Sequence, residues 1–144
     1  IDYGCGKGRV DFFLAWQVRC RTTGVEYDER MIKAAEENRQ RAVSGAKTTF
    51  ILENAALFQV PESADRFYFF NPFSVEILRK VLAGIYESYY EKPREILLMF
   101  YYPSEEYLGC LMTEEQLMFY DEINTEDLFE GKNDREKILI FSVD

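Results

Sequence analysis

The sequence contains no histidine, and this absence excludes several kinds of chemistry at once. A serine or cysteine nucleophile that depends on a histidine base is excluded, and so is a zinc site with histidine ligands. Cysteine is also scarce. Cys5, Cys20 and Cys110 are odd in number and lack metal-ligand spacing. We therefore expect no metal, and we interpret the cysteines as reduced thiols in a cytoplasmic protein.

Positive charge is the second shortage: 17 Lys and Arg stand against 26 Asp and Glu, for a net charge of −9. Nucleic-acid binding needs a basic face, because phosphate contacts supply most of the affinity. The acidic balance therefore does not support nucleic acid as a direct ligand. No apolar run is long enough to cross a bilayer and nothing reads as a signal peptide, so no membrane partner is expected.

What is present indicates a single folded domain over residues 1–144, with 47% hydrophobic residues. Strand-like and helix-like segments alternate, and an alternation of this kind predicts a mostly parallel sheet with helices on both faces. The expected strands are residues 1–3, 22–27, 48–53, 65–70 and 95–101, and the expected helices are residues 8–17, 28–43, 74–90 and 104–111.

Details of these segments support the assignment. Asp28 and Ser74 are suited to cap the second and third helices, and Gly45 to stop the second. The run at residues 65–70, DRFYFF, is almost continuously apolar, which is typical of a strand buried on both faces. Two last strands at residues 116–123 and 137–143 are joined only by an acidic loop, so we expect them to be antiparallel.

The first strand is short in this sequence. Only Ile1 and Asp2 precede Tyr3 and the glycines, whereas a parallel sheet usually begins with several apolar residues. We therefore expect the domain to be truncated inside its first strand.

Three glycines follow that strand at alternate positions, Gly4, Gly6 and Gly8. A glycine turn between a strand and a helix lets the backbone approach a ligand, and the helix end offers free N–H groups. The spacing G-x-G-x-G leaves less room than the dinucleotide pattern G-x-G-x-x-G, so an anion as small as a carboxylate would fit. The alternative is a tight turn without a ligand.

Two polar residues end the next two strands. Glu26 lies 22 positions (26 minus 4) after Gly4, where a carboxylate can accept both hydroxyls of a ribose. Asn54 ends the third strand and is followed by the small Ala55, so its amide could contact an adenine edge. A solvated glutamate and an ordinary turn residue are the competing interpretations.

The fourth strand ends in Asn71-Pro72-Phe73, at the edge of the sheet where ligands of open α/β folds bind. Proline fixes the backbone there, and the asparagine amide can both donate and accept. The alternative is a simple strand end that leads into a helix capped by Ser74.

Taken together, these residues resemble class I S-adenosylmethionine-dependent methyltransferases. IDYGCGKGR resembles the D-x-G-C-G-x-G motif of that family, GVEYDERMIKAAEEN its acidic second motif, and FILENA its third motif. The chain also resembles uncharacterised bacterial members that carry FYFFNPF. The resemblance covers essentially the whole chain and implies a Rossmann-like, doubly wound, mostly parallel seven-stranded sheet with an antiparallel C-terminal strand.

The resemblance also implies roles for individual residues. Asp2, Gly4, Cys5, Gly6 and Gly8 would surround the methionine part of S-adenosylmethionine. Glu26 would hold the ribose hydroxyls and Tyr27 would pack on the adenine. Asn54 with Ala55 would contact the adenine amino group, at a position where the family commonly has aspartate.

Asn71-Pro72-Phe73 resembles the N/D-P-P-Y/F motif of amino-methyltransferases, shortened by one proline. The implied function is methyl transfer to an unidentified acceptor, which includes an amine nitrogen of a nucleobase, a protein or a small molecule; RNA is among the acceptors left open. The alternative is a catalytically weak module of the same fold that binds the cofactor or a partner. A nicotinamide-dependent oxidoreductase is disfavoured by the glycine spacing and the antiparallel end.

Overall fold

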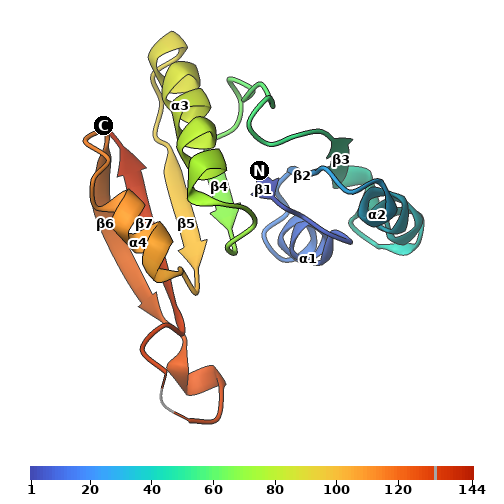
Figure 1. Ribbon diagram of the computed structural model, residues 1–144. Helices are drawn as coiled ribbons and strands as arrows, with labels where there is room; N and C mark the ends of the chain where they lie inside the picture. Colours follow the sequence, from blue (N-terminus) through green and yellow to red (C-terminus); the bar gives the residue numbers. More distant parts are fainter. Residues whose placement is uncertain (132) are drawn as a thin grey trace. The chain divides into compact units, whose positions relative to one another are not determined.

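The computed structural model describes residues 1–131 and 133–144 (Figure 1). The chain divides into two compact units, Ile1–Phe58 and Gln59–Asp144. Each unit has strands of its own and helices packed on them. The prediction of one domain over residues 1–144 stays a prediction.

The first unit alternates strands and helices. Its elements are β1 (Asp2–Tyr3), α1 (Arg9–Gln17), β2 (Thr22–Glu26), α2 (Glu29–Arg41), the 3-10 turn η1 (Gly45–Lys47) and β3 (Thr48–Leu52). The strands are parallel in the order β3-β2-β1, with Asp2 opposite Gly24 and Glu26 opposite Leu52. This order places the C-terminal ends of β1 and β2 side by side, next to the glycine turn.

The second unit begins with another parallel pair and closes with a hairpin. Its elements are β4 (Arg66–Phe69), α3 (Val75–Glu91), β5 (Leu97–Tyr101), α4 (Glu105–Leu111), β6 (Leu117–Asn124), the 3-10 turn η2 (Glu126–Leu128) and β7 (Lys137–Val143). Strands β4 and β5 are parallel, and β7 runs antiparallel to both β5 and β6. The acidic connection between β6 and β7 contains η2, which was expected to be loop; residue 132 of this connection lies outside the described residues.

The predicted fold class is confirmed: the seven strands form a mixed sheet that is mostly parallel, with the antiparallel strand near the C-terminus. The first strand is short, with two residues. Two helix caps that the sequence predicts are present in the structure. Asp28 accepts a hydrogen bond from the N–H of Arg30 at 2.9 Å, and Ser74 accepts one from Ile77 at 3.4 Å. Both satisfy N–H groups that the first helical turn leaves without a partner.

The prediction that Gly45 ends the second helix is wrong. Helix α2 ends at Arg41, its C-cap is Ala42 in an extended conformation, and Gly45 begins η1. Glycine is needed there for a different reason: a Cβ atom on Gly45 would collide with the carbonyl oxygen of Arg39. The backbone therefore folds back against α2, and only glycine permits the approach.

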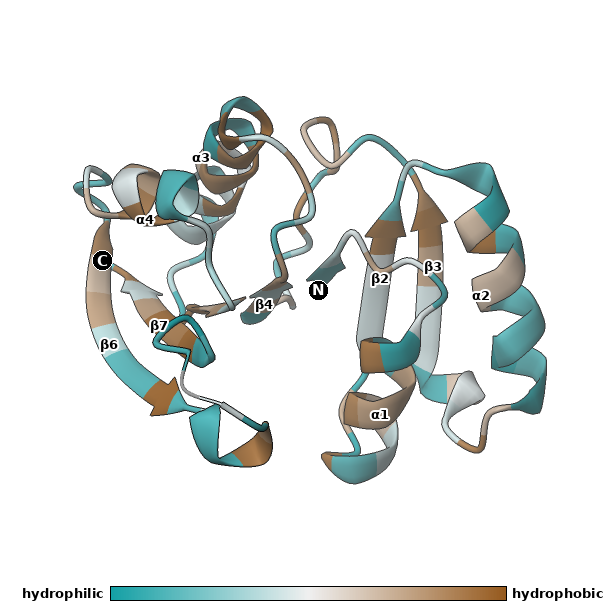
Figure 2. Ribbon diagram, turned by 60° about the horizontal axis from the view of Figure 1, so that its bottom comes forward, coloured by the Kyte–Doolittle hydropathy of each residue, from teal (hydrophilic) through white to brown (hydrophobic). Residues whose placement is uncertain are grey.

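The prediction that residues 65–70 are buried on both faces is also wrong. Phe67 and Phe69 are fully buried, whereas Arg66 is exposed and Phe70 is 54% exposed. Helices α3 and α4 lie over the same face of this part of the sheet (Figure 2). The side chains of β4 therefore alternate between that covered face and the opposite one.

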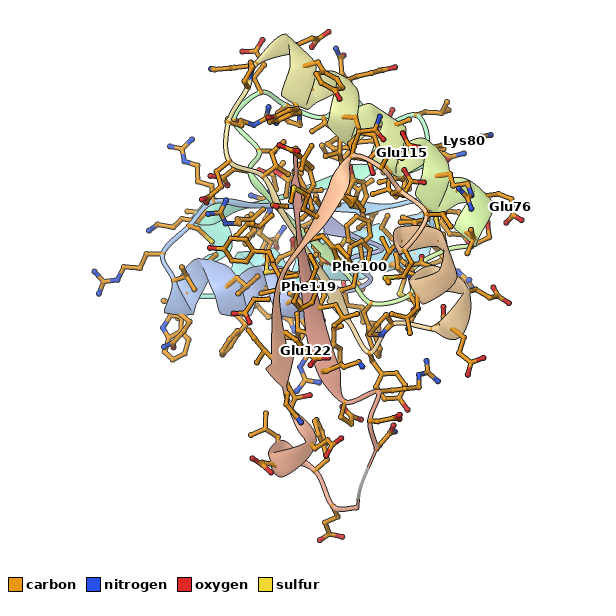
Figure 3. All side chains as sticks on the ribbon, turned by 90° about the vertical axis from the view of Figure 1, so that its left-hand side faces the viewer. Glu76, Lys80, Phe100, Glu115, Phe119 and Glu122 are labelled. Carbon is orange, nitrogen blue, oxygen red and sulfur yellow. The ribbon has the colours of Figure 1, made fainter. Side chains whose placement is uncertain are left out.

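The core of the second unit is a row of aromatic rings across its strands. Phe69 stacks on Phe100 with ring centres 4.5 Å apart, and Phe141 contacts Phe100 edge to face at 6.0 Å. At the outer end of this row, Phe119 is 64% exposed and contacts Phe141 edge to face at 6.1 Å. Figure 3 shows Phe100 and Phe119 among the side chains of this unit. Pairs of this kind each contribute about 0.5–1.5 kcal/mol beyond their burial. They hold the ends of β4 and β5 at fixed positions.

Candidate functional site

The three glycines between β1 and α1 all adopt left-handed backbone conformations. Their φ angles are 73° at Gly4, 54° at Gly6 and 85° at Gly8. Other residues pay about 1–2 kcal/mol for this conformation, so three in five positions make glycine the required residue. The alternate spacing thus reports a repeated left-handed turn.

The glycines differ in what surrounds them. A Cβ atom on Gly8 would lie 2.5 Å from the Phe50 ring, so Gly8 allows α1 to pack closely on β3. A Cβ atom on Gly6 would have no heavy atom within 4 Å. The space over Gly6 is therefore open, which suits a ligand that lies against the backbone.

Strand β2 anchors this glycine loop. The carbonyl oxygen of Val25 accepts hydrogen bonds from the N–H groups of Gly4 and Cys5, at 2.8 and 3.2 Å. Gly8 is the N-cap of α1 and provides no side chain to its first turn. The N–H groups of that turn, at the positive end of the helix dipole, are oriented to bind an anionic group.

Glu26 reaches from the end of β2 back to the loop. Its Oε1 accepts a hydrogen bond from the Gly6 N–H at 3.3 Å, and its Oε2 accepts from Tyr27 and Asp28 at 2.9 and 3.2 Å. These three N–H donors hold the carboxylate at the mouth of the loop. A carboxylate has about four acceptor positions, so capacity remains for a ligand hydroxyl.

Asp2 of β1 and Asp11 in the first turn of α1 are two buried acids on either side of the glycine loop in the sequence. Asp2 is 7% exposed and Asp11 is fully buried in α1. Neither side-chain oxygen of Asp11 receives a hydrogen bond from a donor in the described part of the chain. Burial, followed by the interaction with Asp2, raises the pKa of Asp11 to about 9, and burial also raises the pKa of Asp2. Sequence reasoning did not find Asp11.

A signal for Asp11 was available in the helix. The apolar spacing of Val10, Phe13, Leu14 and Val18 predicts α1 correctly but does not mark its buried side, since Phe13 and Val18 are 57% and 63% exposed. The buried residues of α1 are Asp11 and Ala15, four positions apart. Small Ala15 on the face of Asp11 indicates close packing there.

The other predicted cofactor residues have different environments. Cys5 is buried, and burial followed by the charges of Asp11, Asp2 and Glu26 raises its pKa. Tyr27 is 78% exposed, so its ring is free to contact a ligand. Asn54 is exposed, and its Oδ1 accepts from Ala56 at 3.0 Å in a turn that also contains Ala55.

All nine predicted cofactor residues belong to the first unit, and Asn71, Pro72 and Phe73 belong to the second. Asn71 has a left-handed φ of 43°, and its side chain bridges two strand ends. Its Nδ2 donates to the Tyr102 carbonyl at 2.8 Å, and its Oδ1 accepts from Ser104 at 3.0 Å. The sequence indicated a polar group here but did not reveal this bridge to the segment after β5.

The rest of the motif is held by Tyr107 of α4. The Tyr107 hydroxyl donates to the Phe73 carbonyl at 2.7 Å and accepts from the Phe73 N–H at 3.3 Å. The Phe73 ring is half-buried and meets Phe69 edge to face at 6.4 Å. Burial raises the pKa of Tyr107 to about 12, so the hydroxyl keeps its proton at neutral pH. The backbone after Pro72 is therefore firmly positioned.

Tyr102, bonded to Asn71, lies within a polar and aromatic cluster. Its φ is 49°, its hydroxyl accepts from Asn133 at 2.7 Å, and the Arg135 guanidinium lies 4.3 Å from its ring centre. The neighbouring Tyr101 hydroxyl donates to Glu136 at 2.9 Å. The segment that precedes β7 is thus attached to the end of β5.

Comparison with known proteins identifies the family. Residues 1–89 match the family described as Methyltransferase domain, which is more than half of the 144 residues. The chain therefore belongs to this methyltransferase family. None of the curated proteins compared with the chain matches it.

Solved structures share the fold at low sequence identity. A TehB-like SAM-dependent methyltransferase from Corynebacterium glutamicum has a TM-score of 0.67 at 17% identity, over 99% of this chain and 78% of that chain. The glycopeptide N-methyltransferase MtfA, complexed with S-adenosylmethionine, has a TM-score of 0.74 at 13% identity, over 99% and 85%. The magnesium protoporphyrin IX methyltransferase ChlM from Synechocystis has a TM-score of 0.64 at 18% identity, over 98% and 66%.

Family membership confirms two predictions: the chain is an enzyme of the methyltransferase class, and its cofactor is S-adenosylmethionine. The residues present fit that cofactor. The open space over Gly6 admits a ligand against the backbone, and Glu26 is held with acceptor capacity to spare. Outside residue 132, the structure contains no cluster of three metal-ligating side chains and no helix of the length and apolarity that a bilayer span requires.

Proposed function

We propose that the first unit holds S-adenosylmethionine through the residues around its glycine loop, and that Asn71-Pro72-Phe73 orients a methyl acceptor with an amine nitrogen. The observation that supports the proposed cofactor site is the position of Glu26. Its carboxylate accepts hydrogen bonds from three backbone N–H groups and is therefore held beside the loop. The acceptor is unidentified, and the candidate classes are a nucleobase, a protein and a small molecule.

The proposed contacts follow the chemistry of each group. Glu26 accepts a ribose hydroxyl at the acceptor position that the three N–H groups leave, and exposed Tyr27 covers one face of the adenine. Asn54 presents an Nδ2 donor to the adenine edge, since its Oδ1 is already engaged with Ala56. The open backbone at Gly6 and the uncapped first turn of α1 receive the methionine carboxylate.

Asn71 is proposed to orient the acceptor. Its Oδ1 accepts one hydrogen bond from Ser104 and has a second lone pair for an amine N–H. Such a bond directs the nitrogen lone pair of a neutral amine. The Pro72 carbonyl is proposed to accept the other amine hydrogen, and the half-buried Phe73 ring to pack on the acceptor. Two bonds from Tyr107 limit the movement of this backbone.

The main task of the protein in this reaction is to align the acceptor nitrogen with the methyl group. When bound, S-adenosylmethionine supplies a methyl group that its sulfonium already activates. The chain need provide no covalent nucleophile, which agrees with the absence of histidine and the burial of Cys5. Its residues hold the neutral acceptor nitrogen in line with the methyl group, and alignment of this kind lowers a barrier by several kcal/mol.

A second candidate is a catalytically weak module of the same fold. The observation that favours it is the double use of Asn71, whose donor and acceptor atoms both serve the bridge to the segment after β5. If that bridge is the whole role of Asn71, the motif is structural. In that case cofactor binding would not lead to methyl transfer.

The first experiment is calorimetric titration of the chain with S-adenosylhomocysteine, with NAD as the control ligand. We expect binding of S-adenosylhomocysteine alone. Methyl-labelled S-adenosylmethionine is then offered with free nucleobases, small amines and peptides, using wild type and Asn71→Ala. Lost turnover with retained cofactor binding supports the acceptor role, whereas an equal loss of binding makes Asn71 a cofactor contact or a structural residue.

A further inference from the structure

We propose that Asp11 is a positioning residue that holds a proton against Asp2, so that the pair carries one negative charge and presents the Asp2 carboxylate to the amino group of the cofactor. The proposal rests on the proposed function of the glycine loop. It concerns a residue that no motif of the sequence identifies.

The geometry requires a proton between these two acids. Asp11 is fully buried and Asp2 nearly so, and both Asp11 oxygens lack a donor within the described residues. After burial, Asp2 is the group with the largest effect on Asp11, and two ionised carboxylates can only accept hydrogen bonds. Burying two adjacent negative charges is costly, so the pair retains one proton between them.

The surroundings place that proton on Asp11. The other titratable groups that act on the two acids are the Glu26 carboxylate and the Cys5 thiol. Burial raises the pKa of both carboxyl groups, and Asp11 is the more deeply buried of the two, at 0% exposed against 7% for Asp2. Asp11 is therefore the donor and Asp2 the charged acceptor.

The position of the pair connects it to the cofactor site. Asp2 is the first residue of β1, two positions before Gly4, and Asp11 lies three residues after Gly8. Thr22 on β2 donates its hydroxyl to the Asp11 carbonyl at 3.3 Å, which fixes this turn of α1. The Asp2 carboxylate, oriented by one donor, is then available to a cationic amino group beside the loop.

The test compares three variants. Asp11→Asn keeps a donor and removes the titration. Asp11→Leu has similar size and removes the donor. Thr22→Val removes the neighbouring bond to α1 and leaves both carboxyl groups, so it serves as the matched control. Each is titrated with S-adenosylhomocysteine at pH 6 and pH 8, and each is unfolded in urea, without ligand, between pH 5 and pH 8.5.

We expect Asp11→Asn and Thr22→Val to bind within about threefold of wild type at both pH values. Asp11→Leu should bind at least about tenfold more weakly at pH 6, because Asp2 without its donor holds a proton more readily. Its deficit relative to wild type should shrink at pH 8, when Asp2 ionises. A deficit that is the same at both pH values means that Leu disturbs packing alone and overturns the proposal, as does Asp11→Asn binding as weakly as Asp11→Leu.

The unfolding series tests the proton independently of the cofactor. The folded chain keeps the Asp11 proton well above the pH at which the unfolded chain releases it, so wild-type stability should fall as pH rises through this window. Asp11→Asn should show a shallower fall, and Thr22→Val the wild-type slope at a lower midpoint. Equal slopes for wild type and Asp11→Asn overturn the proton assignment. If wild type does not bind S-adenosylhomocysteine, the proposed function and the cofactor part of this inference fail, and the unfolding slopes still decide whether Asp11 holds the proton.

Discussion

The Oε1 atom of Glu26 accepts a hydrogen bond from the Gly6 N–H at 3.3 Å, across 20 residues of sequence. The bond joins the end of β2 to the glycine loop that follows β1. One carboxylate therefore both closes the loop and remains available to a ligand. The acidic residue and the glycine loop, 20 residues apart in the sequence, therefore lie side by side in the fold.

Replacement of Glu26 should weaken cofactor binding. We expect Glu26→Gln to cost about 1–3 kcal/mol of binding free energy, because the ribose hydroxyl loses its charged acceptor. Calorimetric titration with S-adenosylhomocysteine measures the change. Glu29→Gln, an exposed residue in the first turn of α2, is the control and should bind as wild type does. An unaltered dissociation constant for Glu26→Gln would remove the ribose assignment.

Alanine at two of the loop glycines should have different effects. Gly8→Ala should lower the free energy of unfolding by about 2–5 kcal/mol, since left-handed strain adds to a clash with the Phe50 ring. Gly6→Ala should cost only about 1–2 kcal/mol of stability, because its Cβ meets open space. The same Cβ should weaken S-adenosylhomocysteine binding by about tenfold or more, as it occupies room that a ligand needs.

Urea unfolding and calorimetry separate these effects. Gly109→Ala in α4 is a control with an equally open Cβ and should stabilise the chain by up to about 1 kcal/mol. If Gly6→Ala binds the ligand normally, the open space over the loop is not part of the site.

Asn71→Ala should destabilise the second unit. The change leaves the Tyr102 carbonyl and the Ser104 N–H without their partners, and each lost bond is worth about 0.5–1.5 kcal/mol. Alanine also tolerates the left-handed φ less well than asparagine does. We expect a total loss of about 2–3 kcal/mol by urea unfolding. Asn71→Asp keeps the acceptor for Ser104 and should give a smaller loss; equal stability of wild type and Asn71→Ala would contradict the bridging role.

The three thiols should differ in reactivity. Cys20 is exposed, whereas Cys5 and Cys110 are buried, and burial raises the pKa of both buried thiols. A disulfide reagent at pH 8 should therefore modify one thiol rapidly in the native chain and the other two only on unfolding. Cys20→Ser should abolish the fast phase. Rapid modification of a second thiol would mean that the glycine loop or α4 opens readily.

Much of the fold could be predicted because local signals agree with it. Asp28 and Ser74 cap helices where the sequence places them, and the strands follow apolar runs. Gly45 misled the prediction because a glycine signals either a left-handed cap or a close backbone approach, and the sequence does not distinguish the two. Phe70 was misjudged because the burial of a strand face depends on which helices cover it.

The site could be predicted in part for the same reason. Glycine at alternate positions predicts a left-handed backbone, which is found at Gly4, Gly6 and Gly8. The proposed role of Glu26 as the ribose ligand comes from the family resemblance. Asp11 was missed because an aspartate in a first helical turn is ordinarily a solvated partner of the helix dipole. Its burial follows from the packing of α1 against β2 and β3.

The two hydrogen bonds of the Asn71 side chain have a consequence for any redesign of the proposed acceptor site. The segments that follow β4 and β5 are fastened together by one amide, and both fastening points, Asn71 and Tyr102, have left-handed backbones. Replacing one segment alone would leave hydrogen-bonding groups of the other segment without partners. The two stretches would therefore have to be exchanged together in any redesign of the proposed acceptor site.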